Sequence, residues 1–239
     1  MSRASQTCRA QEKNAILVYN ESMEIEFFGQ SCFRFKGKNA VVVTDPYSTS
    51  GTGLSKLKKL SADIVTVSHQ HEDHNFVGAI KGTDRRPKPF VIDGPGEYEI
   101  DGIFIQGISS YHDQKKGKER GKNTIYCFEI DGLRLVHLGD LGTELSRRQL
   151  EEVNGSDILL VPVGGTFTID AAEAMKVVNQ VEPQVVIPMH YKLPGLKYDL
   201  AGVEDFLKEA GVEEVKPEEK LNISKDKLPD SREIIVLKF

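Results

Sequence analysis

The stretch "VSHQHEDHN", residues 67–75, holds three of the six histidines in this 239-residue chain, together with one glutamate and one aspartate. It begins at the end of "ADIVTVS", an apolar run that is typical of a buried strand. Because a rigid strand fixes the backbone where it ends, side chains placed there can converge on one point. The pattern indicates a metal site, and a polar loop rich in imidazole is the alternative.

The candidate ligands in this stretch are His69, His71, Asp73 and His74. They are too close in sequence to bind one tetrahedral ion together, so they favour two adjacent ions, or one ion whose remaining ligands come from elsewhere. Three further candidates each follow a later apolar run: His112, Asp140 and His190. These placements favour a shared metal site over isolated polar residues.

Short strand-like segments bounded by Gly, Asn or Pro dominate the chain. Asp-Gly pairs at 101–102 and 131–132 lie between apolar runs and predict hairpins. The final segment, 232–239, predicts another strand. We predict a disordered leader over 1–22, followed by a single domain over 23–239 in which a few helices cover paired sheets.

Helical patterns occur late in the chain. The spacing of apolar residues predicts a helix over 168–181, with Thr168 or Asp170 as the N-cap. A second helix is predicted over 198–211, where Gly211 closes it.

Composition excludes several classes of partner. With 31 basic and 36 acidic residues, the net charge of −5 gives no general attraction to nucleic acid or to an acidic membrane. The apolar runs are shorter than the ~20 residues of a membrane span, and the N-terminal apolar island at 16–19 is shorter than the roughly 7–15 residues of a secretory signal. We predict a cytoplasmic protein with free thiols, a cysteine metal ligand being the minor alternative. Its cysteines are Cys8, Cys32 and Cys127.

The motifs "SHQHEDH", "HLGD" and "PMH", with a lone histidine between the first two, resemble those of the metallo-β-lactamase superfamily. "GQSCFRF", "TDPY", "GKNTIYCFEIDGLRLVHLGDLG" and "VPVGGTFTIDAAEA" look like its simple hydrolase branch, which includes the ascorbate-6-phosphate lactonases. The resemblance runs from about Met23 to Tyr198. It implies an α/β (α+β) fold, a four-layer αββα sandwich with the metals at one edge between the sheets.

The resemblance also implies a ligand set. One metal site would use His69, His71 and His112, the other Asp73, His74 and His190, and Asp140 would bridge them. Asp45 of "TDPY" would orient a ligand imidazole, a turn-forming Asp-Pro pair being the alternative. His137 is predicted to support the ligands or fill the core, and Glu72 to face solvent or support the ligands.

The implied chemistry is hydrolysis by a hydroxide bound to two divalent metal ions. Zinc is favoured, and manganese or iron are alternatives. Such ions lower the pKa of a shared water toward ~7. The predicted catalytic residues are Asp73, His71 and Asp140, with Asp73 orienting the hydroxide and carrying a proton. The oxygen-reducing di-iron branch has a glutamate where His71 stands, so this histidine favours a hydrolase.

The loop "DQKKGKERGKN", residues 113–123, carries five basic side chains and predicts an anionic substrate, a solvated hairpin tip being the alternative. Lys192 and Lys197 add to this interpretation, and Asn123 is placed near the metals or in a turn.

We predict a small ester, lactone or phosphodiester as substrate. The alternatives are a phosphodiesterase or nuclease acting on nucleic acid, or a non-catalytic metal-binding scaffold. The 49 residues between Asp140 and His190 are too few for the extra domain of the RNA-processing relatives.

Overall fold

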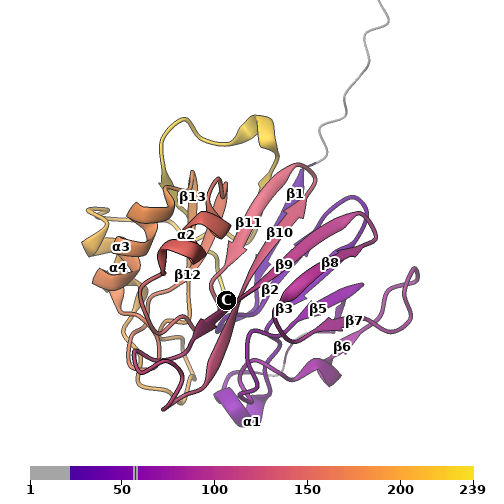
Figure 1. The fold of residues 1–239 in the computed structure, drawn as a ribbon, viewed down its shortest axis with the longest axis horizontal. Coiled ribbons are helices and arrows are strands. Elements are labelled where there is room, and N and C mark those ends of the chain that lie inside the picture. Colours follow the sequence, from indigo (N-terminus) through magenta and orange to yellow (C-terminus); the bar gives the residue numbers. More distant parts are fainter. Residues whose placement is uncertain (1–21, 56, 58) are drawn as a thin grey trace, which may run out of the picture.

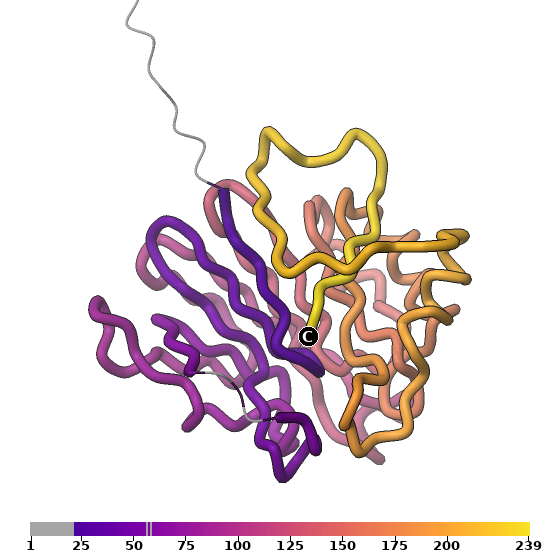
Figure 2. The backbone as a smooth tube through the Cα atoms, turned by 180° about the vertical axis from the view of Figure 1, so that it is seen from behind, coloured from indigo at the N-terminus to yellow at the C-terminus, as the bar shows by residue number. Residues whose placement is uncertain are grey.

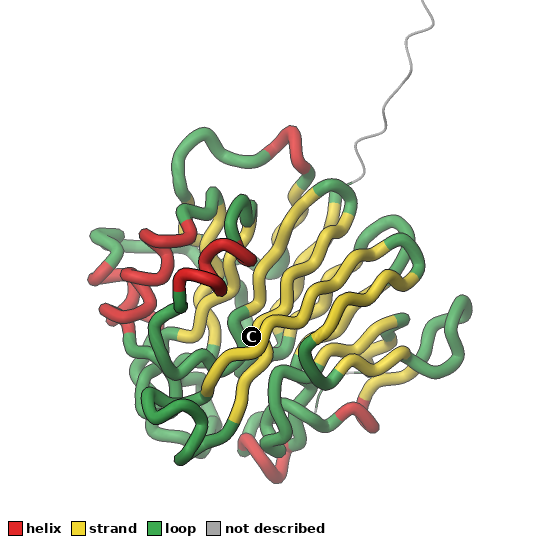
Figure 3. The backbone as a smooth tube through the Cα atoms, in the orientation of Figure 1, coloured by secondary structure: helices red, strands yellow, loops and turns green. Residues whose placement is uncertain are grey.

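The computed structural model describes residues 22–55, 57 and 59–239. The leader predicted over 1–22 therefore lies outside the described residues except for Ser22, and Cys8 lies outside them too. Figure 1 shows two twisted sheets lying against each other, and Figure 3 shows that most helices gather beside the sheet built from the second half of the chain.

The first sheet has six strands, in the order β14 (Leu221–Ile223), β1 (Met23–Phe27), β2 (Phe33–Lys36), β3 (Val41–Thr44), β5 (Ile64–Thr66) and β7 (Phe90–Ile92). The second has seven, in the order β15 (Glu233–Ile234), β13 (Val185–Met189), β12 (Ile158–Pro162), β11 (Leu133–His137), β10 (Lys122–Ile130), β9 (Ile103–Tyr111) and β8 (Gly96–Ile100). A small sheet pairs β4 (Leu60–Ser61) with β6 (Ile80–Lys81). The helices are α1 (Thr49–Thr52), α2 (Arg147–Val153), α3 (Ala171–Val181) and α4 (Val203–Glu209), with 3₁₀ turns η1 (Val77–Ala79) and η2 (Lys225–Lys227).

Both large sheets follow the same plan of antiparallel strands at one side and parallel strands at the other. In the first sheet β3, β5 and β7 are parallel, and in the second β11, β12, β13 and β15 are parallel. Parallel strands end at the same edge of a sheet, where ligands bind in open α/β folds. The loops after β3, β5, β11 and β13 are therefore brought to one region.

The predicted hairpins are confirmed. Asp101-Gly102 joins β8 to β9 and Asp131-Gly132 joins β10 to β11, and all four residues have positive φ angles between 51° and 79°. Positive φ at both central residues is the type I′ geometry that Asp-Gly favours.

The helix predicted over 168–181 begins at Ala171. Asp170 is its N-cap and forms a capping box with Glu173. Thr168 as the cap is wrong, because its hydroxyl donates to the carbonyl of Ile169 within the preceding turn.

Two other predicted elements are shorter in the structure. The helix predicted over 198–211 occupies only Val203–Glu209, because Ala201 hydrogen-bonds through its backbone to Gly164 and Lys192. The strand predicted over 232–239 covers only Glu233–Ile234, and Leu237 adds an isolated bridge to Glu218. Figure 2 shows the C-terminal segment crossing back to the first sheet, where β14 pairs with β1.

Aromatic side chains fill the space between the sheets. Phe35 of β2 packs edge-to-face on Phe128 of β10, with ring centroids 5.4 Å apart. The hydroxyl of Tyr126, also in β10, donates to the carbonyl of Val67 at 2.9 Å. This bond ties the second sheet to the residue just before the histidine cluster.

The two described cysteines, Cys32 and Cys127, are buried free thiols, which confirms the prediction for both. Burial raises the pKa of each thiol, for Cys127 to about 12, so both stay protonated at neutral pH. Neither belongs to a group of candidate metal ligands.

Candidate metal centre

All seven predicted ligands lie together where strands of both sheets end. The loop 68–75 follows β5, His112 follows β9, Asp140 follows β11 and His190 follows β13. Six of the seven side chains are buried, and His71 is the exposed one.

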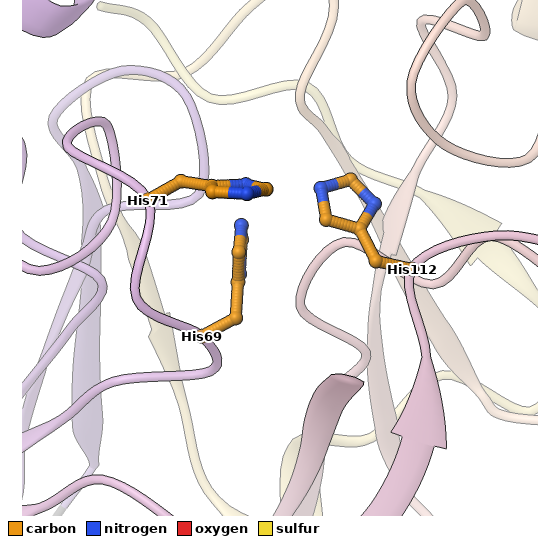
Figure 4. Close-up of side chains that lie close together, drawn as sticks. All are labelled: His69, His71 and His112. Atoms are coloured by element: carbon orange, nitrogen blue, oxygen red, sulfur yellow. The ribbon is translucent and has the colours of Figure 1, made fainter. Parts of the chain in front are cut away.

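The first group consists of His69, His71 and His112. One ring nitrogen of each lies within 4.8 Å of the other two. Figure 4 shows the rings of His69 and His71, from one loop, facing the ring of His112 from the end of β9. Neutral imidazoles that turn their nitrogens toward each other need a cation or a proton between them, so this arrangement suits a metal ion.

The second group consists of Asp73, His74 and His190, again with ligand atoms within 4.8 Å of one another. His74 Nε2 lies 3.4 Å from Asp73 Oδ2. All three residues are buried, and Asp73 and His190 also line a cavity above the centre.

Asp140 lies between the two groups. Its Oδ2 is 3.2 Å from Nε2 of both His74 and His190, 3.3 Å from Nε2 of His112 and 3.8 Å from Nε2 of His69. One carboxylate thus reaches imidazoles of both groups, as a bridging ligand must.

The donor set fits divalent metal ions. Among the described residues, Nε2 of His69, Nε2 of His74 and Oδ1 of Asp140 are buried without a hydrogen-bond partner. A buried polar atom left unpaired costs about 1–3 kcal/mol. Metal ions would use these lone pairs and offset the carboxylate charges.

The pKa shifts agree with such a site. Burial and the neighbouring His74 lower the pKa of His69 to about 3, so this imidazole is neutral at pH 7, as a ligand must be. Burial would also lower the pKa of His74, but the charges of Asp140 and Asp73 outweigh it and hold that pKa well above its ordinary value. Without ions, a proton on His74 balances the buried carboxylates, and metal ions would take over that role.

Asp45 orients His74 from behind, as predicted. Its fully buried carboxylate lies 3.0 Å from His74 Nδ1 and accepts hydrogen bonds from the backbone N–H of Ser68, at 2.7 Å, and from its hydroxyl, at 2.6 Å. If Nδ1 donates to Asp45, the Nε2 lone pair of His74 is free to face Asp73 and Asp140.

His137 and Glu72 also agree with the predictions. His137 is fully buried, its Nε2 lies 2.9 Å from the carbonyl oxygen of Ser31, and its Nδ1 accepts from the backbone N–H of Gly139. It therefore supports the loop that carries Asp140 and is not part of a ligand group. Glu72 is exposed at the mouth of the site.

Gln30 was not predicted as a site residue. Its side-chain Nε2 donates to Asp73 Oδ2 at 3.1 Å and lies 3.3 Å from His190 Nε2, while its backbone carbonyl accepts from the backbone N–H of His190. The sequence signal was its place in "GQSCFRF", which resembles the family without indicating a role. Gln30 holds two candidate ligands from opposite halves of the chain.

Asn123 lies inside β10 and bonds Asp140, which agrees with the predicted place near the candidate ligands and not with the alternative of a turn residue. Its Oδ1 accepts from the backbone N–H of Asp140 at 3.0 Å, and its Nδ2 donates to the carbonyl of Leu138 at 2.9 Å. The side chain fixes the turn between β11 and Asp140.

Two glycines let neighbouring loops approach the backbone of His112 and His190 closely. A Cβ on Gly142 would lie 2.3 Å from the backbone of His112, and one on Gly164 would lie 2.2 Å from the carbonyl oxygen of His190. Any other residue at these positions would push a candidate ligand away from the centre.

The basic loop is organised around Asp113. This carboxylate accepts hydrogen bonds from four backbone N–H groups, those of Lys115, Gly117, Glu119 and Arg120. Within the loop, the ammonium of Lys115 pairs with Glu119.

The ammonium groups of Lys192 and Lys197 are both engaged by backbone carbonyls, and their contribution to attracting an anion stays a prediction. The ammonium of Lys192 donates to the carbonyls of Leu196 and Tyr198, and that of Lys197 donates to the carbonyl of Ser50. Both lysines hold loops together. Their reach to backbone carbonyls depends on tertiary structure that the sequence does not display.

A cavity of about 430 Å³ opens above the centre. Candidate ligands from both groups form its floor, while Arg120, Phe167 and Tyr198 contribute to its wall. Its volume lies within the range of roughly 300–1,000 Å³ of small-molecule sites.

The family profile described as "Beta-lactamase superfamily domain" matches residues 24–190. A UPF0173 metal-dependent hydrolase from Thermococcus onnurineus is 30% identical over 190 residues, covering 71% of this chain and 84% of the relative. Another from Carboxydothermus hydrogenoformans is 28% identical over 214 residues, covering 80% and 94%. A crystal structure from Thermotoga maritima, proposed to be a Zn-dependent hydrolase of the metallo-β-lactamase superfamily, is 37% identical with a TM-score of 0.73, covering 90% of this chain and 98% of that one.

This chain belongs to the β-lactamase superfamily and, within it, to the UPF0173 metal-dependent hydrolases. The predicted superfamily, sandwich fold and hydrolase class are confirmed. The closer resemblance to the ascorbate-6-phosphate lactonases stays a prediction. Among the described residues, no helix combines the length and apolar character needed to cross a membrane.

Proposed function

We propose that this chain hydrolyses a small anionic ester, lactone or phosphodiester with the help of two divalent metal ions. The observation that carries the proposal is the position of Asp140, whose Oδ2 lies within 3.8 Å of imidazole nitrogens from both three-residue groups. A single carboxylate within reach of both groups could bridge a pair of ions, which supports the proposal.

In this proposal the residues form two sets of ligands, and Asp140 would be shared between them. His69, His71 and His112 would hold one ion, and Asp73, His74 and His190 the other. Nitrogen and oxygen donors of this kind suit Zn²⁺ first, and Mn²⁺ or Fe²⁺ as alternatives. Bound there, divalent ions supply a water that ionises near neutral pH and polarise the bond under attack.

Asp73 would move protons in this mechanism. It lines the cavity, and burial would raise its pKa, but the charge of His74 holds that pKa well below its ordinary value. Gln30 donates to Oδ2 of this carboxylate, which fixes its orientation. Asp73 would orient the attacking water and pass its proton to the leaving group.

The proposal is tested by a substrate screen on purified protein loaded with Zn²⁺ or Mn²⁺. Lactones, phosphodiesters, thioesters and β-lactams are offered, and product formation is measured. We expect turnover of at least one class, its loss on chelation and its return when the ion is restored. Turnover that survives complete metal removal would contradict the mechanism, and metal-loaded protein inert toward every class would favour the non-catalytic scaffold.

A further inference from the structure

Two aromatic rings form an apolar wall beside the metal centre. The ring centroids of Phe167 and Tyr198 lie 5.5 Å apart in an edge-to-face arrangement, and both residues line the cavity. The hydroxyl of Tyr198 donates to the carbonyl of Gly51 at 2.9 Å. With its hydroxyl engaged, Tyr198 offers mainly ring surface to a ligand.

Arg120 adds a fixed positive charge to this wall. Its guanidinium carbon lies 5.2 Å from the centroid of the Phe167 ring, and its backbone N–H is held by Asp113 at 2.8 Å. Stacking on an aromatic face pre-orients a guanidinium and leaves its N–H groups available to a ligand.

The guanidinium of Arg120 has no ion pair with any residue that the structure describes. Of the neighbouring basic side chains, Lys115 pairs with Glu119, and Lys192 and Lys197 donate to carbonyls. Lys116, Lys118 and Lys122 belong to the same loop but do not line the cavity. Among the described residues lining the cavity, Arg120 is the only lysine or arginine. A half-buried, unpaired guanidinium is suited to bidentate binding of a carboxylate or a phosphate.

We propose that this wall selects the substrate: an apolar ring or chain packs on Phe167 and Tyr198, while an anionic group remote from the bond under attack pairs with Arg120. The inference rests on the proposed function, because it takes the His/Asp cluster as the place where the bond breaks. The substrate class is then a small ester, lactone or phosphodiester that carries both an apolar body and a second, distal anion.

Two probes that lack a scissile bond test this inference by calorimetry on the Zn²⁺-loaded protein. Benzylsuccinate has a phenyl ring and two carboxylates, one for the metal centre and one for Arg120, and 3-phenylpropionate lacks the second carboxylate. A hydrogen-bonded charge pair contributes about 1.5–3 kcal/mol, so we expect benzylsuccinate to bind roughly 10-fold or more tightly than 3-phenylpropionate.

Arg120→Gln should abolish this preference by weakening benzylsuccinate roughly tenfold or more, with the affinity for 3-phenylpropionate within about twofold of wild type. The backbone N–H that bonds Asp113 survives in this variant, so the loop should keep its fold, which circular dichroism checks. Lys118→Gln is the matched control, because it removes the same charge from an exposed position of the same loop. It should leave the preference unchanged.

An unchanged preference in Arg120→Gln, or an equal loss in Lys118→Gln, would overturn the inference. Because neither probe is hydrolysed, the result is independent of turnover. If benzylsuccinate binds more tightly in an Arg120-dependent way but no screened substrate is hydrolysed, only the proposed function is contradicted. If a substrate is hydrolysed but benzylsuccinate is not preferred, only the proposed role of Arg120 is contradicted.

Discussion

Asp140→Ala should lower kcat/KM for any substrate found in the screen by roughly 10³-fold or more, as expected when one member of a catalytic unit is removed. The carboxylate lies near four imidazoles that arrive from three separate loops. Without it, the two candidate groups lose the carboxylate that lies within reach of imidazoles from both. The measurement is steady-state kinetics together with the metal content of the same sample.

Asp101→Asn is the control for this experiment. It also removes a carboxylate, but at the exposed hairpin turn between β8 and β9, where asparagine tolerates the φ of +52°. Asp140→Asn, which keeps the shape of the side chain, separates loss of charge from loss of packing. An Asp140→Ala protein that keeps more than about a tenth of wild-type kcat/KM would contradict the bridging role.

Asp45→Ala should lower the free energy of unfolding by roughly 3–5 kcal/mol, the usual cost of breaking a buried charged pair. The substitution leaves the N–H and hydroxyl of Ser68 and the Nδ1 of His74 without their acceptor in the interior. Alanine is also strained at the φ of +39° that Asp45 adopts. Urea unfolding of metal-free protein measures the effect without a contribution from bound ions.

Asp45→Asn is the comparison variant, since asparagine tolerates positive φ and keeps one carbonyl acceptor. We expect it to be destabilised less than Asp45→Ala. A loss below about 1 kcal/mol in Asp45→Ala would show that this carboxylate does not hold the loop of Ser68 and His74 in place.

The convergence of the candidate ligands could be predicted because each one follows an apolar strand, and parallel strands end at a common edge. Asp45 was predicted from the resemblance of "TDPY" to the family, and in the structure it directly follows β3. Helix α2 was not predicted, although its sequence indicates a helix start. Ser146 and Gln149 form a capping box with the spacing expected there.

Other features depend on contacts that have no local pattern. Gln30 meets His190 across 160 residues of chain, and nothing in its neighbourhood indicates that contact. An anionic substrate was predicted partly because lysines lie close in sequence to a candidate ligand. In the structure Lys197 donates to the carbonyl of Ser50, 147 residues away. The aromatic wall formed by Phe167 and Tyr198 likewise exists only once the loops after β12 and β13 have packed together.

Whether the His/Asp cluster binds a pair of divalent ions is tested most directly by metal analysis of the purified protein. The chain is stripped with chelator, reconstituted with Zn²⁺, dialysed and analysed by inductively coupled plasma mass spectrometry. We expect about two ions per wild-type chain, an unchanged value for Asp101→Asn and a clear loss for Asp140→Ala. About one ion or fewer per wild-type chain after reconstitution would contradict the two-metal centre.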